Sequence, residues 1–236
     1  MRGRPVPGKG EQPDLLAVVF DLDDTLYAER DYVRSGYRAA GRHLRAAVGR
    51  DEPFEDWLWE RFCAGQSANA FDALSERFAL GLSDGQIAEL VEVYRRHRPD
   101  IRPFPGVREL LDGLAGRYRL GLLTDGYLPA QRLKLEALSL AGAFRAVVFT
   151  EDLGREAWKP STAGFELIAR RLEAPHARCC YVADNPAKDF VGPNRLGWYC
   201  IRYAEGGGVH ASRPAPEGGE AHAVVRSADE LGGLLL

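Results

Sequence analysis

The stretch VVFDLDDTLYAE, from Val18 to Glu29, decides how the fold of this chain is interpreted. An apolar run typical of a buried strand ends abruptly in three carboxylates, Asp21, Asp23 and Asp24. Two carboxylates roughly 4 Å apart repel each other by about 4 kcal/mol at an effective dielectric constant near 20. Such crowding is tolerated only where the charges point into water or where a cation lies between them.

Beyond this stretch, short apolar runs alternate with segments of helical periodicity. This alternation indicates βαβ units and a parallel sheet, and therefore an α/β fold. Strands are expected at residues 15–20, 118–123, 146–150, 179–183, 199–203 and 223–226. Between the first strand and the others lies a long segment with helical patterns and no convincing strand. The predicted organisation is a flexible N-terminal segment at 1–14, a discontinuous core at 15–28 and 105–236, and a helical insert at 29–104.

Composition and charge exclude several classes of function. Hydrophobic residues make up 45% and charged residues 28% of the chain, which is ordinary for a globular protein. The net charge of −3 gives no reason to expect binding to nucleic acid or to an anionic membrane. No apolar run predicts a membrane span or a signal peptide, and no C-x-x-C pair occurs among the cysteines. We therefore expect a reduced, cytoplasmic protein.

Polar side chains follow several predicted strands at their carboxyl ends, where parallel sheets bind ligands. They are Asp21 and Asp23 after the first strand, Thr124 after the second, Lys159 after the third, and Asp184, Asn185 and Asp189 after the fourth. This set contains a lysine that offsets the crowded carboxylates. It also contains enough oxygen atoms for a bound cation.

The chemistry of this set points to phosphoryl transfer. Several carboxylates without a histidine or thiol describe a site for a hard cation, with Mg²⁺ favoured. A hydroxyl, a lysine and the backbone N–H groups of tight turns describe a cradle for a phosphoryl group. An aspartate can attack phosphorus and form an aspartyl-phosphate. A second carboxylic acid nearby can serve first as general acid and then as general base.

Four motifs in this order resemble those of the haloacid dehalogenase (HAD) superfamily. They are D-x-D-x-T at Asp21–Thr25, Thr124 at a strand end, the K-P step at Lys159–Pro160, and D-x-x-x-x-D at Asp184–Asp189. The resemblance covers about residues 16–235. An all-helical insert after the first motif resembles the small cap of the phosphatase-rich branch. The resemblance implies a Rossmann-like parallel sheet core with helices on both faces and an inserted all-helical cap domain.

The resemblance also implies roles for individual residues. Asp21 would be the nucleophile, and Asp23 the acid and base that protonates the leaving group and then activates water. Thr124 and Lys159 would hold the transferring phosphoryl group. The predicted substrate-binding residues are Thr124, Asp125, Gly126 and Lys159.

For the metal, the resemblance implies Mg²⁺ bound by Asp184, the carboxylate of Asp21 and the backbone carbonyl of Asp23. Asp189 would orient these ligands or reach the metal through water. The remaining acid of the first motif, Asp24, is expected to point into solvent.

One residue departs from the common pattern in a way that bears on the site. Asp125 stands where asparagine is frequent in the family. A further carboxylate close to a phosphate is unhelpful unless it faces a substrate hydroxyl or a backbone donor.

The predicted function is a Mg²⁺-dependent phosphatase that acts on a small phosphomonoester, a sugar phosphate or a nucleotide, through an aspartyl-phosphate. Dehalogenase members lack a carboxylate two residues after the nucleophile, so Asp23 favours phosphoryl transfer. A phosphomutase of the same branch, a response-regulator receiver and a catalytically silent HAD-like binding or regulatory module are the alternatives. The predicted partner is a small phosphorylated metabolite, with no nucleic acid and no membrane.

Overall fold

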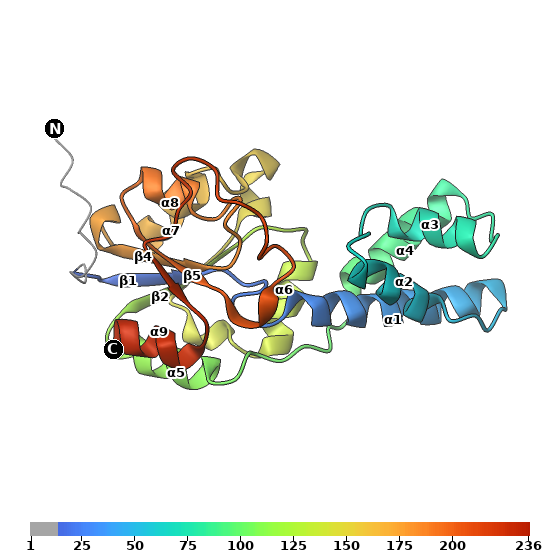
Figure 1. Cartoon of the computed structure of the whole chain (residues 1–236), viewed down its shortest axis with the longest axis horizontal. Coiled ribbons are helices and arrows are strands. Elements are labelled where there is room, and N and C mark those ends of the chain that lie inside the picture. The colour runs from blue at the N-terminus through green and yellow to red at the C-terminus, as the bar shows by residue number, and fades with distance from the viewer. Residues whose placement is uncertain (1–13) are drawn as a thin grey trace. The chain divides into compact units, whose positions relative to one another are not determined.

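The structure, a computed structural model, describes residues 14–236 (Figure 1). The predicted flexible segment at 1–14 therefore lies, apart from Asp14, outside the described residues. The strands are β1 (Ala17–Phe20), β2 (Arg119–Thr124), β3 (Ala146–Phe149), β4 (Cys179–Ala183), β5 (Tyr199–Tyr203) and β6 (Ala223–Val225). The helices are α1 (Glu29–Val48), α2 (Phe54–Cys63), α3 (Ala70–Arg77), α4 (Asp84–Arg96), α5 (Val107–Ala115), α6 (Ala130–Leu138), α7 (Ala163–Arg171), α8 (Val191–Arg195) and α9 (Ala228–Leu235).

The described strands form one six-stranded parallel sheet in the order β3-β2-β1-β4-β5-β6. Phe20, the last residue of β1, lies opposite Leu122 of β2 and Val182 of β4. The strand order reverses between β1 and β4, and ligands bind at such switch points in α/β sheets. The residues that follow β1, β2 and β4 are therefore brought together at one edge of the sheet.

Helices cover both faces of this sheet. In Figure 1, α5 and α9 lie on one face, while α7 and α8 lie on the other. Strands β1 and β4 are buried along their whole length, as expected for central parallel strands. Phe165 of α7 packs edge-on against Tyr181 of β4, with ring centroids 4.9 Å apart. The predicted α/β fold with a Rossmann-like sheet is confirmed.

The chain divides into two compact units. The first comprises the described residues up to 29, together with 102–126 and 138–236, and it contains the sheet. The second comprises 30–101 and 127–137. The sequence predicts residues 127–137 to belong to the core, whereas in the structure most of α6 groups with the helical insert. Inside the second unit, the Lys134 ammonium lies 4.1 Å from the centroid of the Tyr32 ring, and the Arg95 guanidinium lies 3.8 Å from that of Tyr127. These cation–π contacts attach the segment to α1 and α4.

The regular elements of the second unit, within the described residues, are all helices. Val33 and Leu44 of α1 belong to one buried apolar cluster with Phe54 and Leu58 of α2 and Leu90 of α4. These positions recur at helical spacing, so each helix turns one apolar face inward. The predicted helical character of the insert is thus observed, while its role as a cap remains a prediction.

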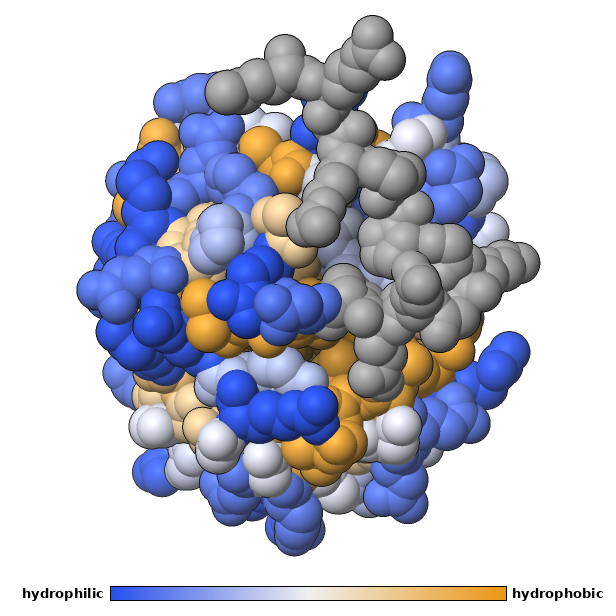
Figure 2. All heavy atoms as spheres, turned by 90° about the vertical axis from the view of Figure 1, so that its left-hand side faces the viewer, coloured by the Kyte–Doolittle hydropathy of each residue, from blue (hydrophilic) through white to orange (hydrophobic). Residues whose placement is uncertain are grey.

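The surface of the described residues exposes few large apolar side chains. Leu153, Val209, Val224 and Leu236 are 37–60% exposed and lie on separate elements. Figure 2 shows one face, on which hydrophilic side chains surround smaller apolar areas. Within residues 14–236, no helix is long and apolar enough to cross a membrane.

Candidate active site

The turn after β1 separates the three carboxylates of the opening stretch. The backbone N–H of Asp21 donates to the carbonyl oxygen of Val182 at 2.9 Å, so this residue continues the ladder between β1 and β4. The N–H of Leu26 then donates to the carbonyl of Leu22 at 3.0 Å. Asp24 has a φ of 50°, a left-handed conformation that aspartate adopts more readily than most residues. The tight turn thus directs successive side chains to different surroundings.

The prediction that Asp24 points into solvent is wrong. Its side chain is buried and accepts hydrogen bonds from the backbone N–H groups of Glu29 at 2.8 Å and Val209 at 2.7 Å. A buried backbone N–H needs an acceptor. The Asp24 carboxylate is the acceptor for one N–H at the start of α1 and for one N–H in the loop after β5. A Cβ at Gly208 would lie 2.9 Å from Asp24 Oδ2, so glycine permits this close approach. Asp24 therefore ties two segments together.

Lys159 is the cation that the crowded carboxylates require. Its ammonium lies 2.9 Å from Asp21 Oδ1 and 2.8 Å from Asp189 Oδ1, and it donates to the Tyr181 hydroxyl at 2.9 Å. Its side chain is 1% exposed. Burial alone would lower the pKa of Lys159, but the carboxylates of Asp189 and Asp21 outweigh it and raise that pKa well above its ordinary value. Lys159 therefore remains charged between the two acids.

A group of three buried acids forms the other half of the site. One carboxylate oxygen from each of Asp21, Asp184 and Asp189 lies within 4.8 Å of the others. Asp184 Oδ2 is buried without a hydrogen-bond partner among the described residues, whereas Asp189 Oδ2 accepts from the Asn185 N–H at 2.8 Å. An oxygen-only donor set with an unsatisfied buried oxygen fits a hard divalent cation. The side chain of Asp23 lies outside this group, so its predicted part in metal binding would fall to its backbone.

Without a metal, this group holds protons unusually strongly. Burial raises the pKa of Asp21 to about 7, with the Lys159 ammonium opposing the shift and Asp189 adding to it. Burial likewise raises the pKa of Asp184 to about 9, and the neighbouring carboxylates of Asp189 and Asp21 add to it. A bound divalent cation would favour the ionised forms of both acids.

These shifts predict how the stability of the metal-free protein depends on pH. In the unfolded chain, Asp21 and Asp184 ionise near the ordinary value of 3.8, but in the folded protein they keep their protons up to about 7 and about 9. The folded state then binds more protons, so the free energy of unfolding falls as the pH rises through this window. We expect the Tm in EDTA to be at least about 3 °C lower at about pH 9 than at about pH 5, which corresponds to roughly 1 kcal/mol.

Differential scanning fluorimetry with Asp184→Asn as comparison tests this expectation. The variant cannot ionise at residue 184, so its Tm should fall less over the same pH range. An equal fall of the Tm with pH in both proteins would show that ionisation of Asp184 does not cause the loss of stability.

Asp125, which follows β2, is expected from the sequence to face a substrate hydroxyl or a backbone donor, and the structure shows a backbone donor beside it. This buried carboxylate accepts a hydrogen bond from the Thr150 hydroxyl at 2.8 Å and lies 3.2 and 3.3 Å from the Lys159 backbone nitrogen. It thus faces a backbone donor. Thr124 is 1% exposed and donates its hydroxyl to the carbonyl of Asp125 at 3.3 Å, while Gly126 has a φ of 134°. The substrate-binding roles of these three residues remain predictions.

Comparison with known proteins now identifies the family. Residues 15–197 match the family of haloacid dehalogenase-like hydrolases. The chain belongs to this family. The four HAD motifs lie within the matched residues, and the structure brings Asp21, Lys159, Asp184 and Asp189 of the first, third and fourth motifs together.

Relatives of this HAD-like hydrolase include phosphatases. The chain is 30% identical over 200 residues to glyceraldehyde 3-phosphate phosphatase from Methanopyrus kandleri, covering 81% of this chain and 85% of the relative. It is 27% identical to the enzyme of the same name from Methanocaldococcus jannaschii, covering 81% and 86%. A 2-haloacid dehalogenase from Pseudomonas syringae pv. Tomato has a similar structure, with a TM-score of 0.62, 25% identity, and 94% and 98% of the chains covered. The predicted family, fold and phosphohydrolase class are confirmed.

Three residues of the HAD-like site were missed by the sequence analysis. The buried Tyr27 donates its hydroxyl to Asp23 Oδ1, and Tyr181 contacts Lys159. The ammonium of Lys188 lies 3.3 Å from Asp125 Oδ2. Tyr27 belongs to the opening stretch and Lys188 to the fourth motif, so their positions offered a signal. Tyr181 lies in an apolar strand, where nothing in the pattern distinguished it from a core residue.

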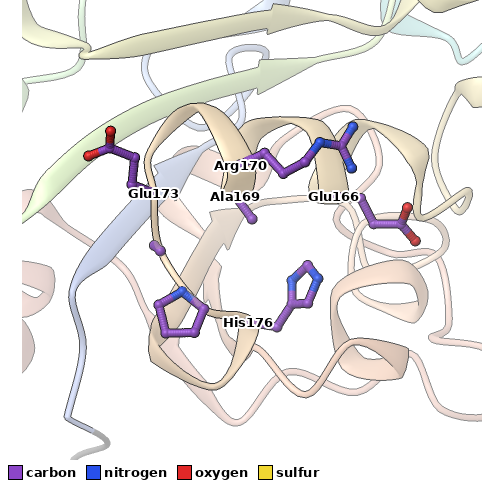
Figure 3. A pocket seen from close by; sticks show the side chains of 7 residues that line it. Glu166, Ala169, Arg170, Glu173 and His176 are labelled. Atoms are coloured by element: carbon purple, nitrogen blue, oxygen red, sulfur yellow. The ribbon is translucent and has the colours of Figure 1, made fainter.

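A surface hollow of about 450 Å³ lies on the first unit but away from this site. It is lined by α7 and the segment before β4, with Arg170 and His176 across from each other (Figure 3). His176 is held there because its Nδ1 accepts a hydrogen bond from the indole N–H of Trp198 at 2.9 Å. The hollow lies at the amino end of β4, whereas the acidic group lies beyond its carboxyl end. It is therefore separate from the candidate active site.

Proposed function

We propose that this HAD-like hydrolase is a Mg²⁺-dependent phosphatase that hydrolyses a small phosphomonoester, most suitably a sugar phosphate, through an aspartyl-phosphate. The observation that carries this proposal is Lys159 held between Asp21 and Asp189, beside a buried oxygen-only group. The names of the two relatives, glyceraldehyde 3-phosphate phosphatases, support a sugar phosphate as substrate. The site lies in the first unit, and the proposed role of the helical insert is to supply specificity for the organic part of the substrate.

In the first half-reaction, a carboxylate oxygen of Asp21 attacks phosphorus and the ester P–O bond breaks. Lys159 orients this carboxylate through its contact with Oδ1. Asp23, in its acid form, gives a proton to the departing alkoxide oxygen. Mg²⁺, held by Asp184 and Asp21, would neutralise charge on the phosphoryl oxygens. The product of this half-reaction is the free alcohol.

In the second half-reaction, Asp23 takes a proton from water, and the oxygen of that water attacks phosphorus of the aspartyl-phosphate. The Asp21–phosphorus bond breaks, and inorganic phosphate is released. The Tyr27 hydroxyl, which donates to Asp23 Oδ1, holds this side chain in place. Asp23 also favours a phosphatase over a dehalogenase, because a halide leaves without needing a proton.

We expect Asp23→Asn to lower kcat by about 10²–10⁴-fold, the usual contribution of general acid–base catalysis. Metal binding should be nearly unchanged, because the side chain of Asp23 faces Tyr27 and lies outside the group of three acids. Stopped assays of phosphate release and a metal titration followed by Tm would measure the two effects. Asp112→Asn, an identical change at an exposed position of α5, is the matched control. A kcat equal to that of the control would contradict the role of Asp23.

Phosphate release from a panel of compounds tests the function itself. The panel should contain glyceraldehyde 3-phosphate, other sugar phosphates, nucleotides and para-nitrophenyl phosphate, each with Mg²⁺ and with EDTA. We expect Mg²⁺-dependent release that is fastest with a sugar phosphate. Halide release from 2-chloropropionate, or conversion of one sugar phosphate isomer into another without phosphate release, would overturn the proposal in favour of a dehalogenase or a mutase.

A further inference from the structure

The hydrogen bonds of Lys159 raise the question of which side chain holds the phosphoryl group. A lysine ammonium has three N–H donors. Three oxygen atoms lie within 2.9 Å of Lys159 Nζ, and they belong to Asp21, Asp189 and Tyr181. The Nζ donates hydrogen bonds to Asp21 Oδ1 and to the Tyr181 hydroxyl, whereas Asp189 Oδ1, among the described residues, is an ion-pair partner without a hydrogen bond. In this arrangement the Lys159 ammonium is committed mainly to positioning the nucleophile, and at most one N–H is left for a phosphoryl oxygen.

Lys188 differs from Lys159 in the number of its polar partners and in the exposure of its side chain. Among the described residues, its ammonium contacts a single polar partner, Asp125 Oδ2 at 3.3 Å, which leaves two N–H donors. Its side chain is 38% exposed, against 1% for that of Lys159. Lys188 is thus a cation that is anchored on one side and accessible on the other.

Asp125 explains why Lys188 lies at this place. The same carboxylate binds the Thr150 hydroxyl, the backbone N–H of Lys159 and the Lys188 ammonium. It therefore links the ends of β2 and β3 to the loop after β4. Where the family frequently has a neutral asparagine, this chain has a carboxylate with a lysine beside it. The additional negative charge of Asp125 is offset by Lys188.

Lys188 also lies close to the nucleophile. It directly precedes Asp189, one of the three buried acids, and its ammonium shares the Asp125 carboxylate with the backbone N–H of Lys159. This position places its charge near the ion pair of Lys159 with Asp21.

We propose that Lys188, anchored by Asp125, binds a non-bridging oxygen of the substrate's phosphoryl group as a second cation beside Lys159. Asp125 is then a positioning residue that acts through Lys188. This inference rests on the proposed phosphatase function. Because the contact is to the phosphoryl group, it serves every phosphomonoester equally and does not select the organic part.

Binding of inorganic phosphate in the presence of MgCl₂, measured by calorimetry, tests this inference without requiring turnover. We expect Lys188→Met to weaken phosphate binding by at least about tenfold, as for one lost hydrogen bond to a charged group. Lys188→Arg should restore part of the affinity, and the Tm of both variants should stay close to that of the wild type. In steady-state assays, kcat/KM should fall by a similar factor for substrates with different organic groups.

A double-mutant cycle tests the role of Asp125. Asp125→Asn keeps an oxygen acceptor for Thr150 and Lys159 but removes the charge that anchors Lys188. We expect it to weaken phosphate binding in the wild type and to have little further effect in the Lys188→Met background. Additive effects would overturn the positioning role of Asp125.

The outcomes separate this inference from the proposed function. Unchanged phosphate affinity in a folded Lys188→Met protein would overturn this inference. Phosphate release by the wild type would still support the proposed phosphatase function. A loss confined to substrates with a second anionic group would also overturn this inference, because Lys188 would then contact the organic part. A third outcome is a wild type that hydrolyses no phosphomonoester but binds phosphate, and a Lys188→Met variant that binds phosphate weakly. The proposed function would then fail, and the phosphate site at Lys188 would stand.

Discussion

Asp21→Asn is expected to reduce phosphate release by at least roughly 10⁴-fold, the scale on which enzymes depend on a single nucleophile. Asparagine keeps the shape of the side chain but cannot form the aspartyl-phosphate. The fold should survive, because the change removes a carboxylate that burial already destabilises in its ionised form. In EDTA at alkaline pH, the Tm of the variant should equal or exceed that of the wild type.

Steady-state assays of purified Asp21→Asn and Asp112→Asn, with circular dichroism to confirm folding, would measure this effect. Asp112 lies exposed on α5, so its change controls for the chemistry of the substitution. Trapping of phosphate on the wild type but not on Asp21→Asn would give a second readout. Normal turnover by Asp21→Asn would rule out the proposed mechanism.

Lys159→Met should have the second largest effect, on activity and on stability together. The substitution leaves the buried carboxylates of Asp21 and Asp189 without their shared cation. Removing one partner of a buried ion pair costs about 3–5 kcal/mol, and each kcal/mol lowers the Tm of a chain of this size by about 2–4 °C. The loss should be larger at alkaline pH, where Asp21 is ionised, than at about pH 5, where it holds its proton. Turnover should fall by at least about 10³-fold, because the nucleophile loses its orientation.

Thermal unfolding of Lys159→Met in EDTA at both pH values, beside Arg195→Met as an exposed control, would measure the loss. Lys159→Arg keeps the charge but not the three-donor geometry, so it should recover stability more than activity. A Lys159→Met protein as stable as the wild type at alkaline pH would show that the two acids do not depend on this cation.

Substitutions of Lys159 and Lys188 should have different effects, because the two lysines have different surroundings. Lys159 is enclosed by three oxygen atoms and supports the fold of the site, whereas Lys188 is partly exposed and holds one contact. Loss of Lys159 should therefore lower stability and kcat together. Loss of Lys188 should lower phosphate affinity and leave stability almost unchanged.

Local patterns in the amino-acid sequence were enough to predict the α/β fold and the edge of the sheet that carries the site. An apolar run followed by a charged turn specifies a central strand and its carboxyl end, since both depend on neighbouring residues. Parallel pairing then brings the ends of β1, β2 and β4 together, so Asp21, Thr124 and Asp184 could be named together in advance.

Tertiary packing determines which partners these side chains take, because the partners lie far apart in the chain. Lys159 reaches Asp21 across 138 residues, and Asp24, which by sequence alone belongs in solvent, is buried by a loop 185 residues away. A carboxylate in a turn sequence looks the same whether it faces water, a backbone N–H or an ammonium group. Its surroundings, and therefore its charge and its role, follow from packing that no local pattern records.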